Sequence, residues 1–193
     1  MTTFGLVLAG GRSSRFGSEK ALARLEGRTL LEIAVERLAR DCAAVAVNAP
    51  AVSGAAAQAQ AMGWPLLSDA AGDPDGPLSG IRAGLRWAAK AGVGRLAVIP
   101  CDAPARPDDL VARLLAELAD APAAAAETDQ GVEPLCAVWT TSALDALGDA
   151  LDSGAHPPVH AFLDLLGARL VRFADAAAFL NVNTPGDLAI AAR

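Results

Sequence analysis

The chain has 193 residues, of which 53% are hydrophobic and 20% charged, and its formal net charge is −6. This length suits one domain, and the hydrophobic fraction is large enough for a sizeable core. The negative charge argues against a protein that binds duplex nucleic acid, because such proteins normally carry a basic surface.

The cysteines and the apolar segments indicate where the chain works. Cys42, Cys101 and Cys136 are widely spaced and odd in number, so they form neither a metal-binding pattern nor a disulfide framework. The first residues lack the basic region of a signal peptide, and no apolar stretch approaches the length of a membrane span. We therefore expect a cytoplasmic protein with no membrane partner.

The first half of the chain alternates apolar runs with amphipathic stretches. Phe4–Leu8 predicts a buried strand, and Thr29 then begins a helix through a capping box with Glu32. Ala44–Asn48 predicts the next strand, followed by an Ala- and Gln-rich stretch. Trp64–Asp69 predicts a third strand.

Helical spacing then marks a helix through Leu78 and Leu85, which Gly92 can end. Arg95–Pro100 predicts a fourth strand, and leucines at positions 110, 114 and 118 mark the helix after it. This alternation of strands and helices predicts a mostly parallel sheet covered on both faces.

The second half is less regular. It predicts a strand, two helices, a strand and a last helix that begins at Thr184: residues 133–139, 143–151, 159–166, 169–173 and 184 onward. No linker or repeat interrupts the chain. We expect one three-layer α/β/α domain over residues 1–193, with ligands bound beyond the carboxyl ends of the strands.

The strongest chemical signal is the segment "LVLAGGRSSRFGSEKAL". Gly10 and Gly11 directly follow a predicted strand, and Arg12, Arg15 and Lys20 lie in the same short loop. Glycines let backbone N–H groups approach a phosphate closely, and the cations neutralise it. The alternative is a solvated surface turn. The segment is neither a Walker A loop nor a dinucleotide fingerprint.

Asp102 is the candidate metal ligand. It follows the apolar strand in "VIPCDAP", and a carboxylate at a strand's carboxyl end can hold Mg²⁺ together with phosphates. The alternative role is a turn cap before Pro104.

Two further segments offer polar contacts. Asp69 ends a predicted strand, and the rigid turn Gly76–Gly80, which includes Pro77 and Leu78, opens a helix whose amides can bind an anion or a base edge. Asn181 and Asn183 alternate along an extended stretch and so point to one side, where they can bind a polar acceptor or form a turn. Asp73 and Asp75 are expected to cap turns, and His156 and His160 are not expected to bind a metal.

Four motifs together resemble the molybdenum cofactor guanylyltransferases. They are "LAGGRSSRFGSEK", "DGPLSGI", "PCDAPARP" and "NVNTPGDL", and the resemblance runs from Leu6 to Leu188. It implies a GT-A-like nucleotidyltransferase fold and an enzyme that transfers GMP from GTP to the molybdopterin cofactor with release of pyrophosphate.

The resemblance also implies roles for individual residues. Leu8, Ala9 and Gly10 contact the nucleotide, Lys20 contacts its phosphates, Asn48 and Asp69 hold the nucleoside, and Asn181 and Asn183 lie on the acceptor side. Asp102 binds Mg²⁺, and Lys20 and Arg15 help to neutralise the leaving pyrophosphate. Arg15 and Gly17 match the motif's arginine and glycine. Phe16 stands where the family usually has Met, and Glu133 where His is expected, which bears on acceptor placement.

Three other functions remain open. The first is a CTP-dependent molybdenum cofactor cytidylyltransferase. Such enzymes resemble this chain in the first loop, but they tend to have Ala-Ala-Gly in place of Ala9-Gly10-Gly11. Another small-acceptor or sugar-phosphate nucleotidyltransferase is a second alternative. A non-catalytic nucleotide-binding partner in cofactor assembly is the third, against which the presence of both Lys20 and Asp102 argues. We expect a monomer with GTP and molybdopterin cofactor as substrates and transient contacts with other cofactor-assembly proteins.

Overall fold

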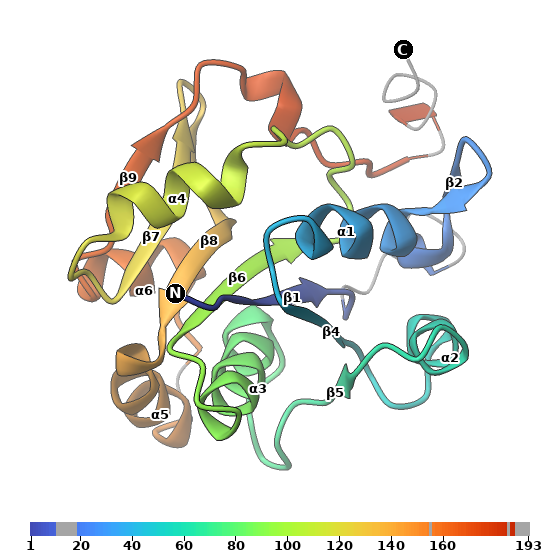
Figure 1. The fold of residues 1–193 in the computed structure, drawn as a ribbon. Helices are drawn as coiled ribbons and strands as arrows, with labels where there is room; N and C mark the ends of the chain where they lie inside the picture. The colour runs from blue at the N-terminus through green and yellow to red at the C-terminus, as the bar shows by residue number, and fades with distance from the viewer. Residues whose placement is uncertain (11–18, 155, 185, 188–193) are drawn as a thin grey trace.

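The protein was analysed as a computed structural model, which describes residues 1–10, 19–154, 156–184 and 186–187. Its centre is a seven-stranded sheet in the order β5-β4-β1-β6-β8-β7-β9 (Figure 1). The strands are β1 Phe4–Leu8, β4 Ala44–Asn48, β5 Leu66–Leu67, β6 Arg95–Pro100, β7 Ala123–Thr128, β8 Gly131–Thr140 and β9 Arg169–Arg172. Strand β8 pairs antiparallel with β6 and β7, and the other pairs are parallel, so the prediction of a mostly parallel sheet is confirmed.

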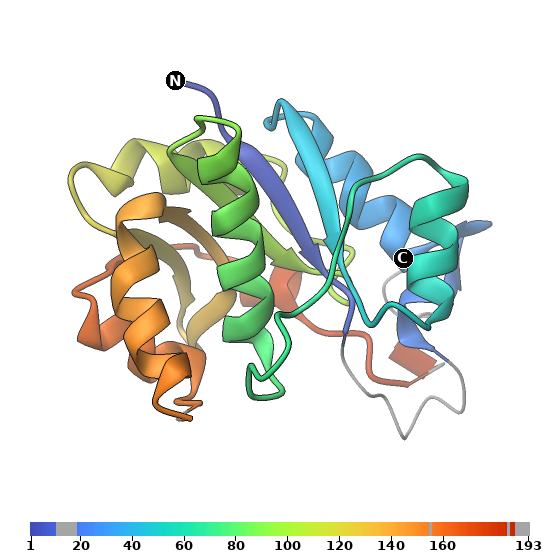
Figure 2. The same cartoon turned by 90° about the horizontal axis from the view of Figure 1, so that it is seen from below.

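Helices cover both faces of this sheet, as Figures 1 and 2 show from two directions. One face carries α1, α2 and α4, and the other carries α3, α5 and α6. The helices are α1 Leu30–Ala39, α2 Gly54–Ala61, α3 Pro77–Lys90, α4 Leu110–Leu118, α5 Leu144–Asp152 and α6 Val159–Leu165. In the described part of the chain, no helix is both long and apolar enough to cross a membrane.

Alternating side chains of the central strands supply the two halves of the core. Val7 of β1 packs with Leu31 and Leu38 of α1, whereas its neighbour Leu6 packs with Leu85 of α3 on the opposite face. All five residues are at most 1% exposed. This burial on both faces explains why the central strands are continuous apolar runs.

Two of the predicted helix starts carry the capping hydrogen bonds that the sequence indicated. Thr29 and Glu32 form the expected capping box at α1, with the Thr29 N–H donating to Glu32 Oε2 at 2.6 Å and the Glu32 N–H to Thr29 Oγ1 at 3.1 Å. Near the end of the chain, the Asp187 N–H donates to Thr184 Oγ1 at 3.3 Å, which fits the predicted N-cap. The rest of that last helix lies outside the described residues.

Besides α2, whose Ala- and Gln-rich sequence was not assigned to an element, three features were not predicted. The first is a small hairpin of β2 Arg24–Leu25 and β3 Arg28–Thr29, whose turn residues Glu26 and Gly27 both have positive φ. The second is β7, which has the sequence AAAAET. The third is a set of 3-10 turns, η1 Lys20–Leu22, η2 Thr141–Ala143 and η3 Ala176–Phe179.

An irregularity in β8 bears on the site. Ala125 of β7 is paired with Ala137, but the next residue, Ala126, is paired with Glu133, so three residues of β8 fall between consecutive partners. Such bulges redirect side chains, and here the displaced segment includes Leu135, which lines the cavity described next.

Candidate active site

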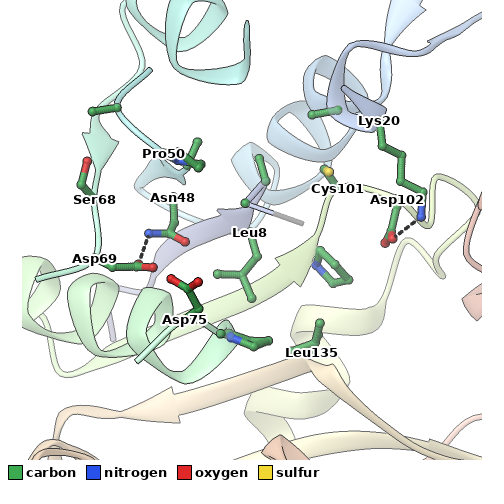
Figure 3. Close-up of a pocket in the computed structure, with 18 residues that line it drawn as sticks. Leu8, Lys20, Asn48, Pro50, Ser68, Asp69, Asp75, Cys101, Asp102 and Leu135 are labelled. Atoms are coloured by element: carbon green, nitrogen blue, oxygen red, sulfur yellow. Dashed lines mark hydrogen bonds and ion pairs between the residues drawn. The ribbon is translucent and has the colours of Figure 1, made fainter. Parts of the chain in front are cut away.

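A cavity of about 700 Å³ lies beyond the carboxyl ends of β1, β4 and β6 (Figure 3). This is the edge of the sheet where the sequence predicted ligand binding. Its walls come from residues that follow these strands and from the start of α3. They are Leu8, Ala9, Gly10, Lys20, Ala21, Asn48, Ala49, Pro50, Ala51, Ser68, Asp69, Asp75, Gly76, Pro77, Pro100, Cys101, Asp102 and Leu135.

One end of the cavity holds a cation and a carboxylate. Lys20 Nζ lies 2.7 Å from Asp102 Oδ2 and donates to Asn183 Oδ1 at 2.8 Å. The other carboxylate oxygen, Asp102 Oδ1, is buried and has no hydrogen-bond partner among the described residues. A buried carboxylate oxygen costs free energy unless it is satisfied, so this atom has unused capacity to bind a cation or a donor.

Backbone hydrogen bonds place these three side chains together. The Cys101 N–H donates to the Leu8 carbonyl at 3.1 Å, which fixes the segment after β6 beside the end of β1. The Val182 N–H donates to the Asp102 carbonyl at 2.7 Å, which brings Asn183 next to Lys20. The structure thus brings the predicted metal ligand Asp102 and the predicted acceptor-side residue Asn183 together at Lys20, which contacts both.

The opposite end of the cavity holds an amide and a carboxylate. Asn48 Nδ2 donates to Asp69 Oδ1 at 2.9 Å and to the Leu67 carbonyl at 3.3 Å. Asn48 is 7% exposed, whereas Asp69 is exposed. Figure 3 shows this pair and the Lys20–Asp102 pair at opposite ends, with Leu8 between them.

The two glycines of the Gly-Pro-Leu-Ser-Gly segment make room for particular side chains. A Cβ on Gly80 would lie 2.3 Å from Asn48 Oδ1, and a Cβ on Gly76 would lie 2.1 Å from His156 Nε2. Gly76 also has φ of +151°, a backbone conformation that side chains rarely adopt. Gly80 therefore allows the Asn48–Asp69 pair to form, and Gly76 packs against an imidazole that the sequence did not connect to the site.

Most of the predicted nucleotide-binding residues line the cavity, with some differences. Leu8, Ala9, Gly10, Gly76 and Pro77 lie in its wall. The side chain of Leu78 instead lies in the core under α3 and is fully buried, so it has only its backbone to offer a ligand. Gly11, Arg15 and Gly17 lie outside the described residues.

The acceptor-side asparagines differ from each other. Both are exposed. The side chain of Asn183 contacts Lys20, whereas Asn181 accepts a 3.5 Å hydrogen bond from Asn183 Nδ2 through its backbone carbonyl. Neither lines the cavity, so they lie beside the end that holds Lys20 and Asp102.

Sequence reasoning misplaced two aspartates of the loop before α3. Asp73 was expected to cap a turn, but its carboxylate pairs with Arg82 of α3, and both side chains are about 5% exposed. Asp75 was also expected to cap a turn, yet it lines the cavity as an exposed carboxylate. No local signal distinguishes these roles, because both depend on where α3 packs.

Glu133 and Arg106 lie behind the site rather than in its wall. Arg106 is 3% exposed and donates to the Pro100 carbonyl at 2.7 Å and to Cys136 Sγ at 3.1 Å. Burial raises the pKa of Glu133, and the positive charge of Arg106 opposes that rise. The unexpected residue on β8 thus faces a buried cation.

The fold and the two-ended polar cavity define a nucleotidyltransferase, and comparisons with known proteins identify the group. The model of the MobA-like NTP transferase domain matches residues 5–169. A molybdenum cofactor guanylyltransferase of Cereibacter sphaeroides is 40% identical over 190 residues, covering 98% of this chain and 95% of the relative. One from Acidiphilium cryptum is 40% identical over 95% of this chain and 90% of its own length. The chain belongs to the MobA-like NTP transferases, among the molybdenum cofactor guanylyltransferases.

Solved structures agree with this assignment. The crystal structure of molybdopterin-guanine dinucleotide biosynthesis protein A from Archaeoglobus fulgidus superposes with a TM-score of 0.77 at 26% identity, covering 97% of this chain and 96% of that one. A 4-diphosphocytidyl-2C-methyl-D-erythritol synthase from Anaerococcus prevotii shares the fold at 11% identity, with a TM-score of 0.73 over 99% of this chain and 94% of that one.

Proposed function

We propose that this enzyme transfers GMP from GTP to the terminal phosphate of the molybdopterin cofactor and releases pyrophosphate. The match to the family and the relatives named molybdenum cofactor guanylyltransferase support this reaction. The observation that carries the proposal is the Lys20–Asp102 pair at one end of a nucleotide-sized cavity, where one carboxylate oxygen of Asp102 has no hydrogen-bond partner among the described residues. A cation and a metal-binding oxygen at this position suit the triphosphate of a nucleotide.

The chemistry is an in-line displacement. An oxygen of the acceptor phosphate attacks the α-phosphorus of GTP, the new P–O bond forms, and the bond to the bridging oxygen breaks with its electron pair leaving on pyrophosphate. Phosphoryl-type transfer depends on positioning and charge neutralisation and needs no protein nucleophile. Lys20 and the amides of the glycine loop would neutralise the leaving group, with Arg15 in the same role.

The residues of the site fit a Mg²⁺ ion. Asp102 Oδ1 is the buried free oxygen that would hold it, and when bound it would supply charge neutralisation at the phosphates. Among the described residues, no group of three or more His, Cys, Asp or Glu side chains is arranged to hold a metal. This agrees with Mg²⁺ sites that use one or two carboxylates and take further ligands from water and substrate phosphates.

The asparagine–aspartate end would hold the guanosine. Asp69 uses one oxygen for Asn48, and no described residue donates to its other oxygen, Oδ2. A carboxylate oxygen can accept the N1–H or amino group of guanine, or a ribose hydroxyl.

Asp102→Asn tests the transfer reaction. The amide has a similar size but loses the charge that would anchor the metal, so we expect a folded protein that loses most GMP transfer, by several kcal/mol in the transition state. The measurement is pyrophosphate release from GTP plus purified cofactor, with CTP as the alternative substrate. Near-normal turnover by Asp102→Asn would refute the metal assignment, and consumption of CTP instead of GTP would refute the choice of base.

Asp69→Asn separates reading of the base from binding of the ribose. If Asp69 accepts guanine donors, the variant should lose part of its preference for GTP over CTP, since the amide of asparagine offers one acceptor oxygen in place of two. If it holds the ribose, both nucleotides should weaken together. Competition between GTP and CTP in one assay measures the ratio, and we expect it to fall. An unchanged ratio would assign Asp69 to the ribose and leave the nucleotide site itself in place.

The same proposal places the reaction in the cytoplasm and requires only a monomer. The described cysteines are all free and buried, which suits a reducing compartment. Transient contacts with other cofactor-assembly proteins would deliver the acceptor, and no nucleic acid or membrane takes part.

A further inference from the structure

Glu19 makes a contact that neither the motif nor the proposed mechanism explains. Its two carboxylate oxygens accept hydrogen bonds from consecutive backbone amides of α2, Oε2 from Gly54 at 2.6 Å and Oε1 from Ala55 at 2.8 Å. These residues are 35 and 36 positions away in the sequence. One side chain thus fastens the end of the glycine loop to the first turn of another helix.

The N–H groups of the first three residues of α2 all donate hydrogen bonds to side chains. Ser53, the N-cap, accepts the N–H of Ala56 at 3.1 Å, and Glu19 takes the two amides before it. A carboxylate at a helix N-terminus also interacts favourably with the helix dipole. Because Ser53 already supplies a local cap, the distant Glu19 does more than begin a helix.

What Glu19 fixes is the residue next to it. Lys20 begins the short turn η1, and the Leu22 N–H donates to the Glu19 carbonyl at 3.0 Å. Lys20 then extends to Asp102, and Ala21 lies buried in the cavity wall. Holding Glu19 therefore holds the backbone from which the Lys20 side chain reaches the phosphate end.

The partner side of this contact belongs to the same cavity. Pro50 and Ala51, just before α2, line it near Asn48. Gly54 is fitted closely against the turn, since a Cβ there would lie 2.4 Å from Leu22 Cδ1 and 2.8 Å from Glu19 Oε2. The contact thus joins the wall beside the nucleoside end to the segment that carries the phosphate-binding lysine.

We propose that Glu19 is a positioning residue for nucleotidyl transfer: its carboxylate clamps the end of the phosphate loop to α2 and thereby sets the position of Lys20 relative to Asp102. The inference rests on the proposed function, because it gives Lys20 a role at the transferred nucleotide. Among the described residues, the Glu19 carboxylate accepts hydrogen bonds from backbone amides alone. Its effect on the reaction passes through the lysine beside it.

Glu19→Gln tests the clamp, with Glu32→Gln as the matched control. Both wild-type carboxylates accept a backbone N–H at a helix start at 2.6 Å, but Glu32 lies in the α1 capping box and not in the cavity wall. We expect similar downward shifts in Tm for both variants. Only Glu19→Gln should lower kcat/KM for GTP, by about tenfold or more, because small displacements of a catalytic group are costly. Its KM for the acceptor should stay within about twofold.

Gly54→Ala breaks the same junction from the other side and carries the test if Glu19→Gln does not fold. It should lower kcat/KM in the same way, and the double variant should be no worse than the worse single variant, because both changes break one contact. Equal kcat/KM for Glu19→Gln and Glu32→Gln would overturn the inference. So would a double variant whose loss of kcat/KM equals the product of the losses in Glu19→Gln and Gly54→Ala. Failure of the wild-type enzyme to consume GTP would instead refute the proposed function.

Discussion

At the scale of single residues, the site depends on glycines, which have no side chain, as well as on its polar side chains. Gly80 lies in the first turn of α3, where alanine would ordinarily stabilise the helix. Its missing Cβ leaves space for Asn48, which in turn orients Asp69. The glycine is thus explained by a contact on a neighbouring strand rather than by the helix that contains it.

Gly80→Ala should therefore act against the usual helix preference. The new methyl group would displace Asn48 and strain a packed region, so we expect the free energy of unfolding to fall by about 1–3 kcal/mol. Affinity for GTP should weaken as the Asn48–Asp69 pair is lost. Urea unfolding and equilibrium titration measure the two effects.

Gly148→Ala is the control for that prediction. Gly148 lies in α5, and a Cβ there meets nothing within 4 Å. This variant should gain roughly 0.5–1 kcal/mol of stability and bind GTP normally. If both glycine variants were stabilised, the packing argument for Gly80 would be wrong.

Sequence motifs indicated several residues that the structure places together, while their roles stay predictions. Lys20, Asp102, Asn48 and Asp69 were all predicted and all line the cavity. The contacts between them were not predicted, since Lys20 meets Asn183 across 163 positions of sequence. Spacing along a chain carries no information about which of two exposed asparagines will reach a lysine.

At the scale of elements, buried charges connect α3 to its surroundings. Arg82 pairs with Asp73 in the loop before the helix and with Asp152 at the end of α5 at 2.6 Å. The Asp152 side chain is 71% exposed, whereas those of Arg82 and Asp73 are about 5% exposed. The two ion pairs should therefore differ greatly in what their loss costs.

Arg82→Leu should cost about 3–5 kcal/mol of stability, because it leaves the Asp73 carboxylate buried without its partner. It should also raise the KM for GTP, since Asp73 anchors the loop that contributes Asp75 and Gly76 to the cavity. Asp152→Asn removes the exposed partner and should cost less than about 1 kcal/mol. Chemical denaturation of both variants checks the ranking, which equal losses would contradict.

The elements most easily predicted were those with strong apolar patterns. Strands β1, β4 and β6 are mostly apolar runs that contain Val, Leu or Ile, and all three were expected at their observed bounds. β7 was missed because its AAAAET sequence has four alanines and only one strand-forming side chain, Thr128. It is a strand because β8 and β9 pair with it on both sides, which is tertiary information.

At the scale of the whole molecule, burial controls the chemistry of the three thiols. Burial raises the pKa of both Cys42 and Cys101 from 9.0 to about 12 and raises the pKa of Cys136 as well. The folded protein therefore keeps the thiols protonated. The unfolded chain loses these protons above pH 9, so the stability that the thiols contribute is complete below pH 9 and declines as the pH rises toward 12.

These thiols should react slowly with a disulfide reagent at pH 8 while the protein is folded. All three should become reactive together as urea unfolds the chain, because each is shielded by the same packed domain. The absorbance of the released thiolate follows the reaction, and the urea midpoint should match that of tryptophan fluorescence. A single thiol that reacts rapidly before unfolding would show that the structure opens locally at that thiol. Cys101 is the position to examine first, because it lies in the cavity wall.

The contacts of Lys20 also have a consequence for how the enzyme acquires activity during folding. Its two partners at the phosphate end lie 82 and 163 positions away in sequence. Contacts between such distant segments are made only after the loops between them have closed, and folds dominated by them form slowly. The core around Trp139 can therefore become buried before Lys20 meets Asp102 and Asn183, and recovery of activity during refolding should lag behind the burial of that tryptophan.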